Sequence, residues 1–233
     1  GRPDDARRLM RHALAVARRD PRTPREQLAW FWLRVGDIEL RAGRLVTADS
    51  AYRAGLATRP NDYRLLAARA RLAAVEHRWQ DAISYGEAAI AQSLDPTTLG
   101  ILSDAHTALG DTVRGREYAH MLDVTVRAQP GAYHRAWSLF LLDHGRQLAT
   151  VHRKVRDELK TRRDVYGYDL LAWSLYRQGR YADARHAMAQ ALQLGTRHAQ
   201  LLYHAGRIEA ANGNADAARE LLARAQTLDP SLR

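Results

Sequence analysis

The feature that most constrains this chain is a small residue that returns every 33 to 35 positions. The column runs backwards from the C-terminal end through Gly206, Ala172, Ser138, Ser103, Ala70 and Gly36. Around these positions apolar residues recur every three or four residues, which is typical of amphipathic helices. A fixed period of this length over most of a chain predicts stacked supersecondary units rather than one globular core.

Two further columns keep the same phase. Seven residues after the small residue stands a turn glycine, at Gly43, Gly110, Gly145, Gly179 and Gly213, with His77 in the remaining unit. Such a glycine supplies the left-handed cap that ends a helix. The second half of each unit has its own small residue, at Ala48, Ala82, Gly115, Ala184 and Ala218, with Thr150 as the exception. Each unit is therefore predicted to be two helices with a turn between them, and the chain to be all-α.

These residues closely resemble the tetratricopeptide repeat family. An aromatic residue or leucine early in the first helix completes the family pattern, here at Trp32, Leu66, Leu99, Tyr168 and Leu202. The resemblance implies a right-handed α-solenoid over residues 29–233, with about six repeats that start near 29, 63, 96, 131, 165 and 199. The match is poor near 131. Residues 1–28 are expected to hold an N-terminal helix from a partial repeat.

The composition agrees with a folded helical chain and leaves the partner open. Hydrophobic residues make up 46% of it, cysteine is absent, and no apolar run is long enough to predict a membrane span. The net charge is +10, and only Lys154 and Lys160 among the 36 basic residues are not arginine. This arginine bias reflects either the coding bias of a GC-rich bacterial genome or an anionic partner. The opening residues do not predict a signal peptide, and bacterial cytoplasm and periplasm both stay open.

The resemblance implies a concave groove lined by the first helices. In the first three repeats the groove positions predict partner contacts at Trp30, Leu33, Arg34, Asp37, Arg71 and Asp104. By the family's geometry, Trp32 should lie in the core while Trp30 and Leu33 face the groove. Members of the family that hold a chaperone's C-terminal carboxylate use Lys and Asn where this chain has Leu33 and Asp37, so that clamp is not expected.

The last repeats are the predicted centre of recognition. Their groove positions are Arg135, Tyr166, Asp169, Trp173, Tyr176, Arg177, Tyr203, His204 and Arg207. Aromatic side chains beside arginine offer large contact area together with charge-assisted hydrogen bonds. The alternative is that the aromatic residues only pack between helices. We adopt that interpretation for Tyr168 and expect Trp173 and Tyr176 to be exposed.

A basic helix in the fourth repeat is a second candidate surface. Its patch consists of Arg153, Lys154, Arg156, Lys160, Arg162 and Arg163. Basic residues grouped along a helix can bind phosphate, an acidic protein or a membrane surface. The interspersed acidic residues Asp157, Glu158 and Asp164 favour a solvated face instead.

Motifs for catalysis and for metal binding are missing from the sequence. The ten histidines form no H-E-x-x-H pair, and neither a phosphate-binding glycine loop nor a nucleophile elbow is present. No enzymatic activity, metal or cofactor is therefore predicted.

The leading hypothesis is a non-enzymatic scaffold that holds a peptide or a partner helix in its groove. Aromatic anchors would take apolar side chains, and the arginines at 34, 71, 135, 177 and 207 would select acidic ones. The alternatives are polyanion or nucleic-acid binding through the arginine-rich surface, and the sensory or assembly arm of a larger protein. Self-association through the C-terminal helix pair, near Leu221, Leu222 and Leu228, is a further possibility.

Overall fold

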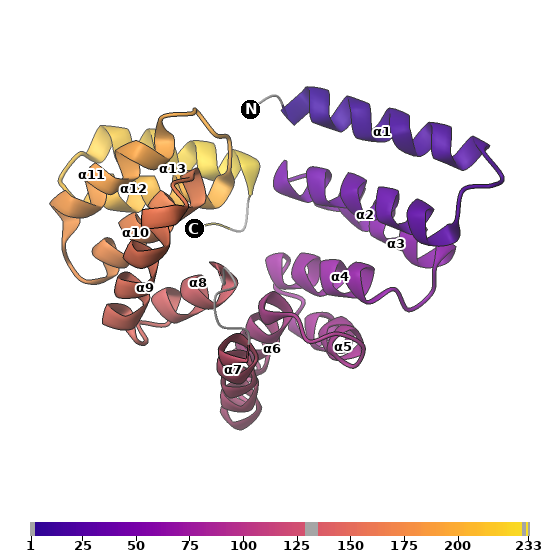
Figure 1. The fold of residues 1–233 in the computed structure, drawn as a ribbon, viewed down its shortest axis with the longest axis horizontal. Coiled ribbons are helices and arrows are strands. Elements are labelled where there is room, and N and C mark those ends of the chain that lie inside the picture. The colour runs from indigo at the N-terminus through magenta and orange to yellow at the C-terminus, as the bar shows by residue number, and fades with distance from the viewer. Residues whose placement is uncertain (1–2, 129–134, 230–231, 233) are drawn as a thin grey trace. The chain divides into compact units, whose positions relative to one another are not determined.

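The computed structural model describes residues 3–128, 135–229 and 232, and all regular structure within these residues is α-helical. The chain divides into two compact units, the N-terminal unit of residues 2–134 and the C-terminal unit of residues 135–233. Figure 1 shows the ribbon, and each unit is described by itself. The predicted all-α fold is confirmed, whereas the expected start of the fourth repeat near 131 lies outside the described residues.

The N-terminal unit consists of one helix followed by three helix pairs. Its helices are α1 (Pro3–Arg19), α2 (Arg25–Arg41), α3 (Leu45–Thr58), α4 (Tyr63–Val75), α5 (Trp79–Ile90), α6 (Pro96–Ala108) and α7 (Thr112–Arg127). The pairs are α2 with α3, α4 with α5 and α6 with α7, and each second helix also packs on the next first helix where one follows within the unit. The first helices α2, α4 and α6 also contact one another in order, and α1 packs on α2.

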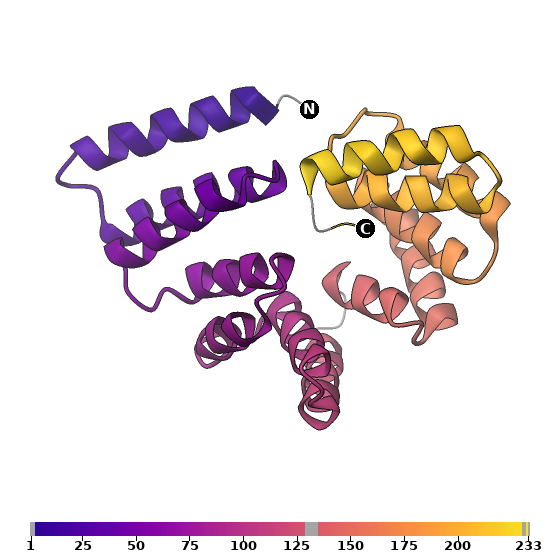
Figure 2. The same ribbon diagram turned by 180° about the vertical axis from the view of Figure 1, so that it is seen from behind.

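The C-terminal unit repeats the same pairing. Its helices are α8 (Arg135–Asp143), α9 (Leu148–Thr161), α10 (Val165–Arg177), α11 (Tyr181–Leu192), α12 (Ala199–Ala211) and α13 (Ala215–Leu228). The first helix α10 contacts both α8 and α12, so these three helices form one continuous layer. Figure 2 shows from behind how α12 and α13 lie side by side.

Aspartates start several of the first helices. Asp62, Asp95 and Asp164 precede α4, α6 and α10, and each side chain accepts a backbone N–H from the first turn. A cap of this kind satisfies an N–H that has no partner within the helix, and stabilises the helix by about 1 kcal/mol. The helix starts therefore follow from local sequence.

The turn column has the conformation that its glycines predict. Gly43, Gly110, Gly145, Gly179 and Gly213 have φ between 67° and 87°, in the left-handed region. His77, which breaks the column in sequence, adopts φ 55° at the same place in its repeat. The repeat geometry thus overrides the local preference, because an L-residue costs about 1–2 kcal/mol in this region.

The small-residue column lies where the two helices of a pair touch. A β-carbon on Gly206 would stand 2.7 Å from Cγ of Leu222 on α13, and Ala70 and Ala172 are fully buried. Larger side chains at these positions would separate the helices. The recurring small residue is therefore a packing requirement and carries no partner contact of its own.

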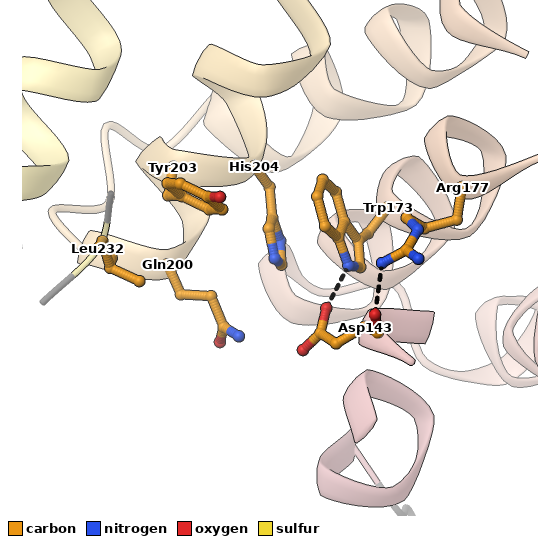
Figure 3. Close-up of a pocket in the computed structure, with 7 residues that line it drawn as sticks. All are labelled: Asp143, Trp173, Arg177, Gln200, Tyr203, His204 and Leu232. Atoms are coloured by element: carbon orange, nitrogen blue, oxygen red, sulfur yellow. Dashed lines mark hydrogen bonds between the residues drawn. The ribbon is translucent and has the colours of Figure 1, made fainter. Parts of the chain in front are cut away.

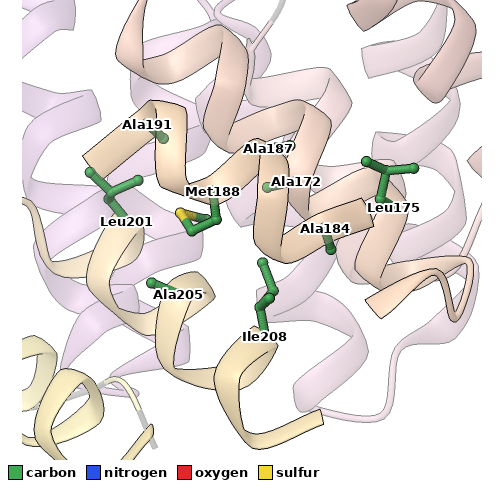
Figure 4. Packing of buried hydrophobic residues seen from close by; sticks show 9 residues of the cluster. All are labelled: Ala172, Leu175, Ala184, Ala187, Met188, Ala191, Leu201, Ala205 and Ile208. Carbon is green, nitrogen blue, oxygen red and sulfur yellow. The ribbon is translucent and has the colours of Figure 1, made fainter. Parts of the chain in front are cut away.

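The hydrophobic core runs from one repeat into the next. Figure 4 shows the C-terminal cluster, which joins α10, α11 and α12 through Ala172, Leu175, Ala184, Ala187, Met188, Ala191, Leu201, Ala205 and Ile208. The N-terminal unit has an equivalent cluster around Tyr52 and Leu65, and Trp32 packs beside a smaller one formed by Leu14, Val35 and Ala51. Each helix pair thus relies on its neighbour for burial, as expected of a repeat array.

An arginine cage attaches α1 to the first pair. Glu39 of α2 is fully buried and accepts hydrogen bonds from Arg7 (2.8 Å) and Arg11 (2.9 Å) of α1, and from Arg44. Burial alone would raise the pKa of Glu39, but these arginines outweigh it and hold the pKa below its ordinary value. Breaking the cage would therefore leave a buried charge without partners.

Candidate functional site

A pocket of about 350 Å³ lies on the layer of first helices in the C-terminal unit. Its walls come from the end of α8, from α10 and α12, and from the segment after α13. The lining residues are Asp143, Trp173, Arg177, Gln200, Tyr203, His204 and Leu232 (Figure 3). Four of them, Trp173, Arg177, Tyr203 and His204, belong to the predicted partner-contact set.

Two of the lining residues, Trp173 and His204, belong to a stack of three rings. The ring of Trp173 lies parallel to Tyr176 at 4.7 Å and to His204 at 4.1 Å, so both of its faces are covered. Its Nε1 donates a hydrogen bond to Oδ1 of Asp143 at 2.8 Å, and only 5% of the residue is exposed. The expectation of an exposed Trp173 is therefore wrong, because neighbouring rings cover it. Tyr176 is half-buried.

A buried charge cluster underlies the stack. Asp169 is fully buried, and its Oδ2 accepts a hydrogen bond from Arg135 Nη2 at 2.7 Å. Nδ1 of His204 lies 2.7 Å from the other carboxylate oxygen, Oδ1. Burial alone would raise the pKa of Asp169, but His204 and Arg135 outweigh burial and lower it. Asp169 and His204 were predicted as partner contacts, but they are only 0% and 2% exposed. We therefore assign them a structural role beneath the site. Arg135 also lies over the ring of the exposed Tyr166.

Two arginines border the stack without pairing to a carboxylate within the described residues. Nη1 of Arg177 donates to the backbone carbonyl of Asp143 at 2.9 Å, and Nη1 of Arg207 donates to the hydroxyl of Tyr203 at 3.2 Å. The pKa of Arg207 is raised, chiefly by hydrogen bonding with Tyr176. Both guanidinium groups thus lie beside aromatic rings, with neutral oxygen atoms as their partners.

The predicted contacts of the N-terminal unit form an internal network instead. Asp37 is buried and accepts hydrogen bonds from Tyr52 (3.0 Å) and Arg71 (2.8 Å), while Arg34 lies 3.4 Å from its second oxygen. Leu33 is only 4% exposed, in the core with Tyr52, so its predicted partner contact is wrong. The helix turns Leu33 toward the second helix of its own pair.

Trp30 and Asp104 are predicted residues of this unit that lie at the surface outside the Asp37 network. Trp30 is 38% exposed with Arg34 over its ring at 5.7 Å, and Asp104 is exposed on α6. Their role in partner binding stays a prediction.

Half of the basic patch on α9 and just after it is engaged by the protein itself. Lys160 pairs with Asp157, Arg162 pairs with Asp164, and the ammonium of Lys154 lies 4.9 Å from the ring centre of Trp137. Arg153, Arg156 and Arg163 are exposed. The structure therefore weakens the case for a dense polyanion site, which stays a prediction.

Three pocket residues were not predicted from sequence. Asp143 lies five residues after the small residue of its repeat, Ser138, which is the position that Arg177 has relative to Ala172. Gln200 lies six residues before Gly206, which is the position that Tyr166 has relative to Ala172. The repeat register therefore contained a signal for Asp143 and Gln200. Leu232 follows the last helix, outside the repeat register, so no column could have indicated it.

Other classes of site find no counterpart in the described residues. No group of three His, Asp or Glu side chains there is arranged to hold a metal ion, and no described helix is long and apolar enough to cross a membrane.

Comparison with known proteins agrees with the repeat pattern. Residues 170–232 match the tetratricopeptide repeat family. A tetratricopeptide repeat protein from Parabacteroides merdae has a similar structure, with a TM-score of 0.57 and 16% identity over 97% of this chain and 86% of that chain. The Cut9–Hcn1 hetero-tetramer of the APC/C is also similar, with a TM-score of 0.52 and 18% identity over 87% of this chain and 40% of that chain. No curated protein matches the sequence.

Proposed function

Because this chain is a tetratricopeptide repeat protein, we propose that it is an interaction scaffold that binds an extended peptide segment of a partner along α8, α10 and α12. The repeat fold in general supports protein–protein interaction, and the family is typically non-enzymatic. The single observation that supports this placement is the pocket on the first-helix layer of the C-terminal unit.

The pocket has the properties of a binding anchor point. Trp173 and His204 are held by stacking and hydrogen bonds, so little side-chain entropy is lost when a ligand packs against them. Tyr203 and Leu232 add apolar surface at the opening. A pocket with aromatic walls is where one partner side chain can contribute most of the binding energy.

The neighbouring charges indicate the chemistry of the partner. Arg34 and Arg71 are paired with Asp37, and Arg135 is paired with Asp169. Among the five predicted acid-selecting arginines, Arg177 and Arg207 differ because no carboxylate of the described residues pairs with them. A partner segment with an apolar side chain for the pocket and an acidic one beside it would match this surface.

A pocket-filling substitution tests the proposal. Peptides would first be selected from a random phage-displayed library on the whole protein, and their affinities measured by fluorescence anisotropy. Gln200→Trp would fill the pocket from the half-buried start of α12. We expect this substitution to lower the affinity for the selected peptides at least tenfold, which corresponds to a loss of about 1.4 kcal/mol in binding free energy.

The matched control is Gln193→Trp, the same change at an exposed glutamine at the end of α11. It should leave the affinities unchanged, and circular dichroism should show both variants folded. Equal binding by Gln200→Trp and the unchanged protein would rule out the pocket as the anchor point.

A further inference from the structure

We propose that the pocket takes a lysine or arginine side chain of the partner segment, with the carboxylate of Asp143 as its counter-ion. This inference rests on the proposed function and replaces the apolar side chain expected in the pocket with a basic one, whose aliphatic stem supplies the apolar contact. The partner segment would then carry a basic and an acidic residue close together in its sequence.

The first argument is the way in which Asp143 is held. Trp173 Nε1 binds Oδ1 at 2.8 Å, which fixes the carboxylate at the end of α8. Figure 3 shows the second oxygen turned away from Trp173, toward the side on which Gln200 stands. Arg177 is adjacent, yet it donates to the backbone carbonyl of Asp143 rather than to the carboxylate. Within the described residues, the Asp143 carboxylate has no ion pair.

The second argument is the contrast with three buried carboxylates on the first helices. Asp37, Glu39 and Asp169 each bind at least one arginine within 2.9 Å. The sequence has 36 basic residues against 26 acidic ones, so a cation is usually within reach of an acid. Burial raises the pKa of Asp143, and Trp173, His204, Arg177 and His144 offset this only in part. A carboxylate that is fixed, faces a pocket and forms no salt bridge among the described residues is therefore a candidate for pairing with a ligand cation.

The third argument is the shape and surface of the pocket. The half-buried Tyr203 provides ring surface along which an aliphatic stem can lie, beside the buried Trp173 and His204, while its charged end reaches Asp143. Aromatic rings also attract a cation electrostatically. Opposite Asp143, Oε1 of Gln200 accepts a hydrogen bond from Arg135 Nη2 at 3.3 Å, and the charge of Arg135 is paired with Asp169. The volume of about 350 Å³ is ample for one long side chain.

The positive charge of Arg177 opposes a ligand cation and must be offset. Its guanidinium lies 6.0 Å from the ring centre of Trp173, at the border of the pocket. The acidic residue of the partner, expected at Arg177 and Arg207, would neutralise it. The basic and the acidic residue of the segment would thus support each other's binding.

The test uses positional-scanning pools of acetylated, amidated hexapeptides, in which one position is fixed as Lys, Arg, Gln or Met. Blocked termini ensure that all charge comes from side chains. We expect the best Lys or Arg pool to bind the whole protein about tenfold more tightly than the Gln and Met pools at the same position. Asp143→Asn keeps an oxygen for Trp173 Nε1 and removes the charge, so it should abolish this preference.

The control is Asp216→Asn, which makes the same change at an exposed aspartate on α13 that pairs with Arg219. It should retain the preference, and thermal melting should show both variants folded. An equal loss of the preference in this control would overturn the inference, because net charge would then explain it. A uniform loss of affinity for every pool in Asp143→Asn would also overturn it, since Asp143 would then only support Trp173.

The two proposals fail separately. Pools that lose binding in Gln200→Trp but show no preference for Lys or Arg would overturn the cation pocket and leave the peptide site standing. Pools whose binding is insensitive to Gln200→Trp would overturn both.

Discussion

The two units place different chemistry at the same repeat positions. In the N-terminal unit the residue after the small position is Asp37 on α2 and Arg71 on α4, and these two bind each other across one period. In the C-terminal unit the same position is Trp173 on α10 and Arg207 on α12, which border a ring stack and a pocket. Equivalent positions of the repeats therefore form an internal ion pair in one unit, and a buried ring stack with a pocket beside it in the other.

The difference shows that charge on a first helix is not by itself a sign of recognition. Arg71 is paired with Asp37 of the neighbouring repeat and Arg34 with Asp37 of its own helix, while Arg177 and Arg207 bind neutral oxygen atoms. Partner binding is better indicated by groups whose charge the chain has not already paired.

The largest expected effect on stability comes from replacing one tryptophan in each unit, Trp173 and Trp30. Trp173→Ala removes a buried ring that is stacked on both sides, and should destabilise the C-terminal unit by about 3–5 kcal/mol. Trp30→Ala, at a residue 38% exposed, should cost well under half of that. Hydrogen exchange with mass spectrometry, resolved by helix, would measure both. A larger loss of protection from Trp30→Ala would contradict the assignment of Trp173 to the framework.

The second effect concerns the two buried carboxylates. Asp169→Ala leaves Arg135, 18% exposed, and the buried His204 without their acceptor, and should cost about 3–5 kcal/mol. Glu39→Ala should cost less, because Arg7, Arg11 and Arg44 are 36–47% exposed and can turn to water. Exchange protection of α10 and α12 should fall in the first variant, and that of α1 and α2 in the second. Equal losses would show that exposure of the partners does not matter here.

The third effect is the pH dependence of the stability that Asp169 contributes. The folded pKa of Asp169 is lowered, so its stabilisation is complete above the ordinary aspartate pKa of about 3.9 and is lost as pH falls through the folded value. The difference in melting temperature between the native protein and Asp169→Asn should therefore be largest at neutral pH and shrink at about pH 3 or lower. Asp216→Asn, at an exposed site, should differ little from the native protein at any pH. A difference in melting temperature that stays constant with pH would mean that the charge of Asp169 does not stabilise the folded protein.

The smallest effect lies in the turns. His77→Gly should stabilise the N-terminal unit by about 1 kcal/mol, because His77 adopts the left-handed conformation that glycine takes without strain. Gly179→Ala, at φ 75° in the C-terminal unit, should destabilise by a similar amount. Chemical denaturation monitored by circular dichroism would show both shifts. A destabilised His77→Gly would mean that the ring contact with Trp79 outweighs the backbone strain.

The sequence by itself determined the helices, their turns and the phase of the repeats. These depend on local chemistry, such as the left-handed turn at Gly213 and the aspartate cap at Asp164, together with a period that makes one repeat predict the next. Even His77 follows the column that it breaks in sequence.

Only the tertiary structure decided which first-helix residues are available to a partner. Trp173, Asp169 and His204 occupy positions that the repeat pattern assigns to the groove, yet side chains from neighbouring helices cover them. Asp143 becomes part of a pocket because α10 and α12 bring Trp173 and His204 beside the end of α8. The physical reason is that a periodic pattern specifies the direction of a side chain from its own helix. Burial and pairing depend on residues one or two periods away, whose identities vary from repeat to repeat.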